Sequence, residues 1–212
     1  MKKFYQLFFC VGLTAFFILI MGEPSFAQSD EGTSQREQRL VRPKNTMAGM
    51  TIGSIHIASD RYKEIFENPS TATGIEASYL FFSKSHYLGF TFEVKCLSQA
   101  GHSTVTNQNT YFSLTPLTLT GKYMISLSDF IPYLGVGIDL FFYKEKSHLS
   151  LVSGSTPGFH MEGGIYYQPP LFDFIKIRAA LRISRAMAKE NDIKINLGGL
   201  EFGLGILYCF DI

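Results

Sequence analysis

Nucleophilic catalysis requires a hydroxyl or thiol beside a base that accepts its proton. Ser184 is the hydroxyl that raises this question, but the residue two positions before it is Arg182 rather than a histidine, and His160 is only a distant candidate base. We therefore nominate no catalytic residue. The histidines also lack the spacing of metal ligands, and most fall in expected loops, turns or strand ends, so we expect no metal and no other cofactor. The five are His56, His86, His102, His148 and His160.

Ionisable side chains recur instead at alternate positions within apolar segments. Five acidic and five basic residues share this placement: Glu76, Glu93, Lys95, Lys122, Asp139, Glu162, Lys176, Arg178, Arg182 and Glu201. An unpaired buried charge is costly, so near-equal numbers of the two signs predict a paired network. Arg178 and Arg182 lie about 13 Å apart on one face of a strand. We expect them to contact different acidic side chains rather than one shared anion.

The segments that carry these charges alternate with a period of two, which is typical of β-strands. Leu88 and Phe90, for example, face one way, and Thr91 and Glu93 face the other. We expect eight strands, at 46–57, 73–83, 87–97, 110–125, 131–143, 158–168, 172–186 and 195–210. Long polar connections (58–72, 98–109, 144–157 and 187–194) alternate with short ones. This pattern predicts an all-β fold, an eight-stranded antiparallel up-and-down transmembrane β-barrel spanning 46–212.

The sequence also predicts a local feature at Pro116 and the state of two cysteines. Pro116 removes a donor from the ladder of the fourth strand, and the apolar residues after it continue on a different face, so we expect a β-bulge. Cys96 and Cys209 lie near opposite ends of their strands, about 30 Å apart. That separation is beyond the reach of a disulfide, so both are expected as free thiols.

The composition agrees with a barrel. Charged residues make up only 17% of the chain and aromatic residues 15%, yet beyond the N-terminus no apolar run is long enough for a membrane-spanning helix. Aromatic residues near strand ends are expected at the two lipid interfaces. They are Tyr79, Phe81, Phe82, Tyr87, Tyr133, Phe141, Phe142, Tyr143, Tyr166, Tyr167, Phe172, Phe174, Tyr208 and Phe210.

The N-terminus has the features of an export signal. Lys2 and Lys3 precede the apolar run 7–21, and Ser25-Phe26-Ala27 places small residues at both cleavage-determining positions. We expect a signal peptide at 1–27, cleaved after Ala27, and a disordered periplasmic leader at 28–45; a retained helical anchor is the alternative. Cleavage reduces the 19 basic and 18 acidic residues to 17 of each. This balance gives no support for nucleic-acid binding.

Two segments resemble the OmpA/OmpW-like family of outer membrane β-barrel proteins. One is Thr115-Pro-Leu-Thr-Leu-Thr-Gly-Lys-Tyr123 with Ile131-Pro-Tyr-Leu-Gly-Val-Gly-Ile-Asp139, and the other is Gly205-Ile-Leu-Tyr-Cys-Phe210. The resemblance implies an eight-stranded barrel in the outer-membrane lipid. It also implies an insertion signal, Gly205, Tyr208 and Phe210, that the barrel-assembly machinery reads. The chain departs from the family pattern because Asp211 and Ile212 follow the last aromatic residue.

These features favour an integral outer-membrane barrel with a side-chain-filled polar lumen and a structural or surface-interaction role. An eight-stranded barrel is just wide enough for its side chains to fill the interior. A narrow channel for small solutes is the first alternative. A lipid-modifying enzyme similar to the lipid A deacylase barrels is the second, and it is disfavoured because no Ser–His motif is found. A soluble periplasmic lipocalin-like barrel also stays open. The sequence names no partner for the loops.

Overall fold

The computed structural model describes residues 45–66, 69–82, 86–102, 109–147, 151–172, 174–190 and 193–211. The expected signal peptide 1–27, and all of the expected leader 28–45 except Asn45, lie outside these residues. Within the described part of the chain, no helix is long and apolar enough to cross a membrane.

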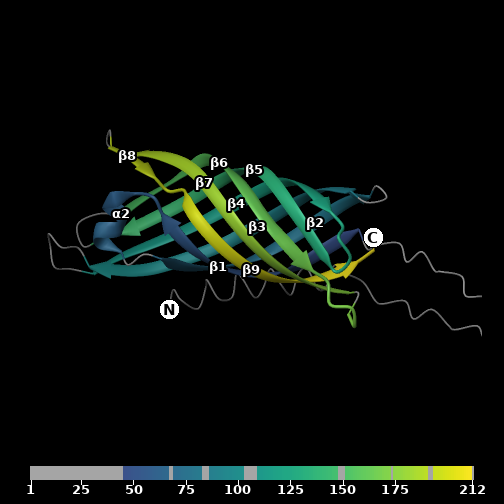
Figure 1. Cartoon of the computed structure of the whole chain (residues 1–212). Helices are drawn as coiled ribbons and strands as arrows, with labels where there is room; N and C mark the ends of the chain where they lie inside the picture. The colour runs from purple at the N-terminus through teal and green to yellow at the C-terminus, as the bar shows by residue number, and fades with distance from the viewer. Residues whose placement is uncertain are drawn as a thin grey trace, which may run out of the picture. The chain divides into compact units, whose positions relative to one another are not determined.

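Eight strands close a β-barrel in which every strand is antiparallel to both of its neighbours (Figure 1). The strands are β1 (Thr46–Ile57), β2 (Ser70–Phe82), β3 (His86–His102), β4 (Asn109–Ile125), β5 (Phe130–Lys146), β6 (Leu151–Tyr167), β7 (Ile175–Glu190) and β9 (Gly199–Phe210). Sequential neighbours pair from β1 to β7, and β9 lies between β7 and β1. The prediction of an eight-stranded up-and-down barrel is confirmed.

The two ends of the barrel differ. At one end, which we call the loop end, lie the short helix α2 (Asp60–Ile65) and the short strand β8 (Ile193–Asn196) (Figure 1). At the other, the turn end, β2–β3, β4–β5 and β6–β7 are joined, and the described chain begins and ends there, at Asn45 and Asp211.

Several strands extend further toward the loop end than the sequence pattern predicts. Strand β6 begins at Leu151 rather than at 158, and β5 and β6 pair without interruption as far as Lys146 and Leu151. The residues from 151 to 157 lack strict apolar alternation, which is why they read as a loop. Backbone pairing does not need that alternation once the neighbouring strand continues.

The expected last strand, 195–210, is divided in two. Residues of β8 turn back and pair with the end of β7, from Met187↔Asn196 to Glu190↔Ile193. Asn196 stabilises this corner, because its Oδ1 accepts hydrogen bonds from the backbone N–H groups of Ala186 at 3.2 Å and Gly198 at 3.1 Å. Strand β8 is therefore a hairpin extension of the barrel wall.

The expected bulge at Pro116 is wrong. Both ladders of β4 keep a constant register past this residue, with Leu117↔Val94 and Leu114↔Leu97 on one side and Pro116↔Phe141 on the other. Burial also alternates through Pro116 without a change of face. The missing N–H removes a donor locally and shifts nothing else.

Alternate side chains face opposite sides of the wall throughout the barrel. On β5, Leu134 and Ile138 are 71% and 65% exposed, whereas Tyr133 and Asp139 are 4% and 5% exposed. From Leu134 to Phe142 the outward row is apolar over about 26 Å at strand rise. The apolar residues thus face outward and the charges inward, which is the reverse of a soluble barrel.

Two apolar clusters close the interior, one at each end. The loop-end core consists of Ile55, Ile57, Tyr62, Phe66, Ala72, Leu97, Phe112, Leu114, Phe141, Ala186, Ala188 and Leu197. The turn-end core consists of Met47, Leu80, Met124, Ile131, Tyr133, Tyr166, Ala180, Leu207 and Cys209. The expectation of a lipid-interface position is wrong for five aromatic residues, because their positions in the alternation place them on the inner face, in or against these cores: Tyr87, Tyr133, Phe141, Tyr143 and Tyr166.

Helix α2 contributes to the loop-end core. Tyr62 stacks on Phe66 with ring centroids 4.9 Å apart, and both rings contact Phe112 of β4. The Tyr62 hydroxyl lies 2.8 Å from Ser70 Oγ and donates to Gln99 Oε1 at 2.6 Å. Burial raises the pKa of Tyr62 above its usual value. The helix is thus packed into the barrel mouth rather than lying free in a loop.

Cys96 and Cys209 form no disulfide; Cys96 is half-buried and Cys209 is buried. Their positions opposite Thr73 of β2 and Met47 of β1 place them toward different ends of the barrel. Both cysteines therefore lie as predicted, toward opposite ends of the barrel and without a disulfide between them.

The loop-end core gives a stability prediction. Phe66→Ala should lower the free energy of unfolding by about 3 kcal/mol or more, because it leaves a cavity among buried aromatic rings. Phe172→Ala is the control, since Phe172 is 47% exposed; it should change stability by less than about 1 kcal/mol. Urea unfolding of the refolded barrel measures both, and equal losses would contradict a packed α2.

Candidate functional site: the charge network of the lumen

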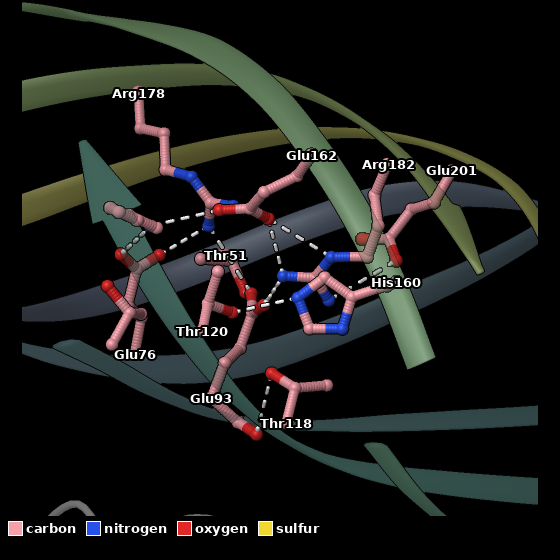
Figure 2. A network of polar contacts seen from close by, with 12 residues as sticks. Thr51, Glu76, Glu93, Thr118, Thr120, His160, Glu162, Arg178, Arg182 and Glu201 are labelled. Atoms are coloured by element: carbon pink, nitrogen blue, oxygen red, sulfur yellow. Dashed lines mark hydrogen bonds and ion pairs between the residues drawn. The ribbon is translucent and has the colours of Figure 1, made fainter. Parts of the chain in front are cut away.

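Each strand that carries inward charges places at least one of them between the two apolar cores. On β3, for example, Tyr87 packs against the turn-end core, Glu93 and Lys95 follow, and Leu97 belongs to the loop-end core. Eight of the expected residues meet in this middle layer, which we call the lumen charge network: Glu76, Glu93, Lys95, Lys122, Glu162, Arg178, Arg182 and Glu201. Figure 2 labels all of them except the two lysines. Four are acidic and four are basic.

Glu162 of β6 is the centre of this network. Its Oε2 accepts from Arg178 Nη2 at 2.9 Å and from Arg182 Nε and Nη2 at 3.0 and 2.7 Å. Lys122 Nζ lies 3.1 Å from its Oε1. The expectation that Arg178 and Arg182 do not share an anion is wrong. Side chains lean along a strand, so the two guanidinium groups approach each other more closely than their Cα atoms do.

Glu93 of β3 forms a second bridge between the same arginines. Its Oε2 lies 2.6 Å from Arg182 Nη2 and 3.0 Å from Lys95 Nζ, and its Oε1 lies 3.5 Å from Arg178 Nη1. Thr51 Oγ1 of β1 donates to the same Oε1 at 3.0 Å. The carboxylate is fully buried and has a partner for each oxygen.

Glu76 of β2 connects the network to the turn-end core. It pairs with Arg178 and accepts from Lys122 Nζ at 3.2 Å and from the Tyr166 hydroxyl at 3.2 Å. Lys122 also donates to Tyr166 at 2.8 Å and lies 4.7 Å above the ring of Tyr133. The two tyrosines give these cations an aromatic face in place of water.

Glu201 of β9 closes the network on the loop-end side. It pairs with Lys95, and its Oε2 lies 3.8 Å from Arg182 Nη1. Four carboxylates and four cations thus neutralise one another across six strands. Removing one partner of a buried ion pair is strongly destabilising, because the other charge is left without compensation.

Asp139 and Lys176, the other two expected members, lie apart from this network. Asp139 of β5 contacts His160 of β6, with 2.8 Å between Oδ1 and Nδ1. Lys176 of β7 lines a small cavity at the turn end with Ser126, Gln168 and seven other residues. The part of the chain that the structure describes places no carboxylate within ion-pair distance of Lys176.

His160 is also an interior residue, although the sequence analysis did not place it among the inward side chains. Its Nε2 lies 2.9 Å from Thr120 Oγ1, which completes a hydroxyl–imidazole–carboxylate row with Asp139. Gly137 makes room for the ring, because a Cβ there would lie 2.7 Å from Nε2. The even spacing from Glu162 was the signal that could have placed His160 inside.

This row has the connectivity of a nucleophile, base and orienting acid, yet it is closed off from the surface in this structure. Thr120 is 0% and His160 1% exposed. Ser184, which lies opposite His160 in the β6–β7 ladder, hydrogen-bonds with the backbone of Gly199 instead. Among the described residues, no group of three or more His, Cys, Asp or Glu side chains could hold a metal ion.

The residues of the expected insertion signal lie on β9. Gly205 faces Thr51 of β1 and Arg178 of β7 in the two ladders. Tyr208 is 56% exposed on the outer face, and its ring stacks with that of Phe210 at a centroid distance of 6.1 Å.

The barrel is similar to several solved structures of outer-membrane proteins. Neisserial surface protein A matches 78% of this chain with 97% of its own, with a TM-score of 0.58 and 14% identity. OprG from Pseudomonas aeruginosa (80% and 97%, TM-score 0.53, 14% identity) and Ail, the attachment invasion locus protein of Yersinia pestis (79% and 99%, TM-score 0.52, 14% identity), match similarly. The chain has the fold of the eight-stranded outer-membrane barrels. No protein-family model and no curated protein matches it.

Two inward cations of β7 give a matched test of the network in this outer-membrane barrel fold. Arg182→Met should lower the free energy of unfolding by about 3–5 kcal/mol, because Glu93 and Glu162 lose their shared partner. Lys176→Met removes a buried charge that has no carboxylate partner among the described residues, so it should be neutral or stabilising. Chemical unfolding of both variants in detergent micelles provides the comparison. Similar losses would show that pairing is not what stabilises Arg182.

Proposed function

We propose that the mature chain is an integral protein of a bacterial outer membrane, with a closed lumen and a structural or surface-interaction role. The observation that carries this proposal is the layered interior. An apolar core, a neutralised charge network and a second apolar core follow one another along the barrel axis. A solute passing through would have to separate Arg178 and Arg182 from Glu162, which is costly in a medium of low polarity.

The outer surface supports a lipid environment. Large apolar side chains that are half or more exposed lie on the outward positions of all the barrel strands, such as Met50 on β1, Phe92 on β3 and Val136 on β5. An apolar band about 25 Å tall is what an outer-membrane barrel presents to lipid. In water the same surface would be an aggregation hazard.

Outer-membrane barrels have long loops on the outside of the cell and short turns in the periplasm. In that orientation the loop end of this barrel faces the outside. The matched Yersinia protein is named for attachment and invasion, which supports a surface-interaction role for the corresponding end of this chain. Helix α2 and the hairpin of β7 and β8 give that end a packed rather than an open surface.

Fractionation and conductance together test the proposal. The expressed protein should sediment with outer membranes and migrate on gels in a heat-modifiable way. Reconstituted in planar bilayers, it should show no stable open state, because the network and both cores fill the lumen. Recovery from the soluble periplasm would overturn the location, and a sustained conductance would favour the narrow channel.

We further propose that the barrel-assembly machinery reads Gly205, Tyr208 and Phe210 during insertion. Phe210→Ala should reduce the heat-modifiable fraction in cells while leaving unassisted refolding in detergent unchanged, since the side chain lies at the strand end. Phe202→Ala, on the same face of β9, is the control and should leave assembly in cells intact. Equal assembly of the two variants in cells would contradict this role.

A further inference from the structure

We propose that the outward surface of β5–β8 at the loop end binds the phosphate groups of anionic lipids in the adjoining leaflet. This inference rests on the proposed membrane location. The surface consists of five exposed basic side chains, which we call the basic rim: Lys144 and Lys146 on β5, Arg185 and Lys189 on β7, and Lys194 on β8.

The basic rim lies on one side of the barrel. Strands β1, β2 and β9 contain no lysine or arginine, and the Lys95 of β3 and the Lys122 of β4 are buried in the lumen. Every outward lysine or arginine on the described strand residues therefore belongs to β5, β7 or β8. Such clustering is not expected of charges that serve only to keep a surface in water.

Acidic residues on the described strands take inward positions. The outward positions of the described strand residues include no aspartate and no glutamate, and Glu145, between Lys144 and Lys146, has the inward phase of β5. Lys194 lies opposite Lys189 in the β7–β8 ladder, so this hairpin presents both side chains on the same outward face.

The rim continues directly from the apolar rows below it. On β5 the outward row runs from Leu140 and Phe142 to Lys144, and on β7 it runs from Ile183 to Arg185. Each step of two residues is about 7 Å along the strand. An amphiphile whose acyl chains lie on the apolar rows would thus bring its phosphate to the level of the cations.

Small side chains beside the β5 lysines leave space for such a group. Strand β6 presents the exposed hydroxyl side chains of Ser153 and Ser155 opposite Lys144 and Phe142 of β5, beyond the last β6–β7 pair, Gly158↔Ala186. Lysine and arginine bind phosphate through charge-assisted hydrogen bonds, and a serine hydroxyl adds a neutral donor. The chemistry fits a phosphorylated headgroup better than a carboxylate on a rigid protein surface, because the cations are spread over three strands.

Spin-labelled lipids measure this preference directly. The chain from residue 28 onward, refolded in phosphatidylcholine vesicles, should restrict the motion of labelled phosphatidic acid in preference to labelled phosphatidylcholine. We expect a preference of about fivefold, the factor that one basic side chain contributes near an anionic surface. Added salt should reduce it.

Two variants locate the effect. Lys144→Gln/Arg185→Gln/Lys194→Gln should bring the preference close to unity while the restricted fraction of phosphatidylcholine stays constant. Lys144→Gln alone should lower the preference, whereas Lys63→Gln, which removes an exposed loop-end lysine from α2, should not.

Each failure has its own signature. Absence of any restricted lipid would refute the membrane location itself. Restricted lipid with no anionic preference, or with a preference that the triple variant keeps, would refute the basic rim. Rim-dependent binding of soluble tripolyphosphate by the detergent-solubilised barrel, without a lipid preference, would instead assign the rim to a soluble polyanion.

Discussion

The pairing of Glu162 with Arg178, Arg182 and Lys122 is the interaction on which the rest of the barrel depends. Outward rows are apolar, so an ionised inward side chain has to find its counter-charge within the lumen. The partners come from β4, β6 and β7, and Glu93 extends the same pairing to β3. A slip of one residue in any ladder would turn its charges toward the outside, so the network selects the register.

The two apolar cores complete this arrangement. They separate the charges from water at both ends, which strengthens each ion pair and raises the cost of breaking it. The loop-end core recruits Tyr62 and Phe66 from α2, and the turn-end core supplies Tyr133 and Tyr166 to the network itself. A barrel built in this way is a stable support for its loop end. The row of Thr120, His160 and Asp139 is buried in the same filling.

Alternation was enough to predict the barrel and to place ten charges on one face, because that pattern depends only on the two-residue period of a strand. It could not predict that Arg178 and Arg182 meet on Glu162, which depends on side-chain conformation. It missed His160 because a lone histidine has no distinctive neighbours in the sequence. Strand ends beyond the apolar rows, such as the start of β6 at Leu151, follow from the neighbouring strand rather than from local residues.

The central claim is that the lumen charge network is dry and paired. The Nε–H groups of Arg178 and Arg182 report on this directly, since one donates to Tyr133 and the other to Glu162. Nuclear magnetic resonance of the refolded barrel should show both as sharp signals in slow exchange with water, assigned by Arg→Lys substitution. Signals that exchange as fast as that of the exposed Arg185 would contradict the account.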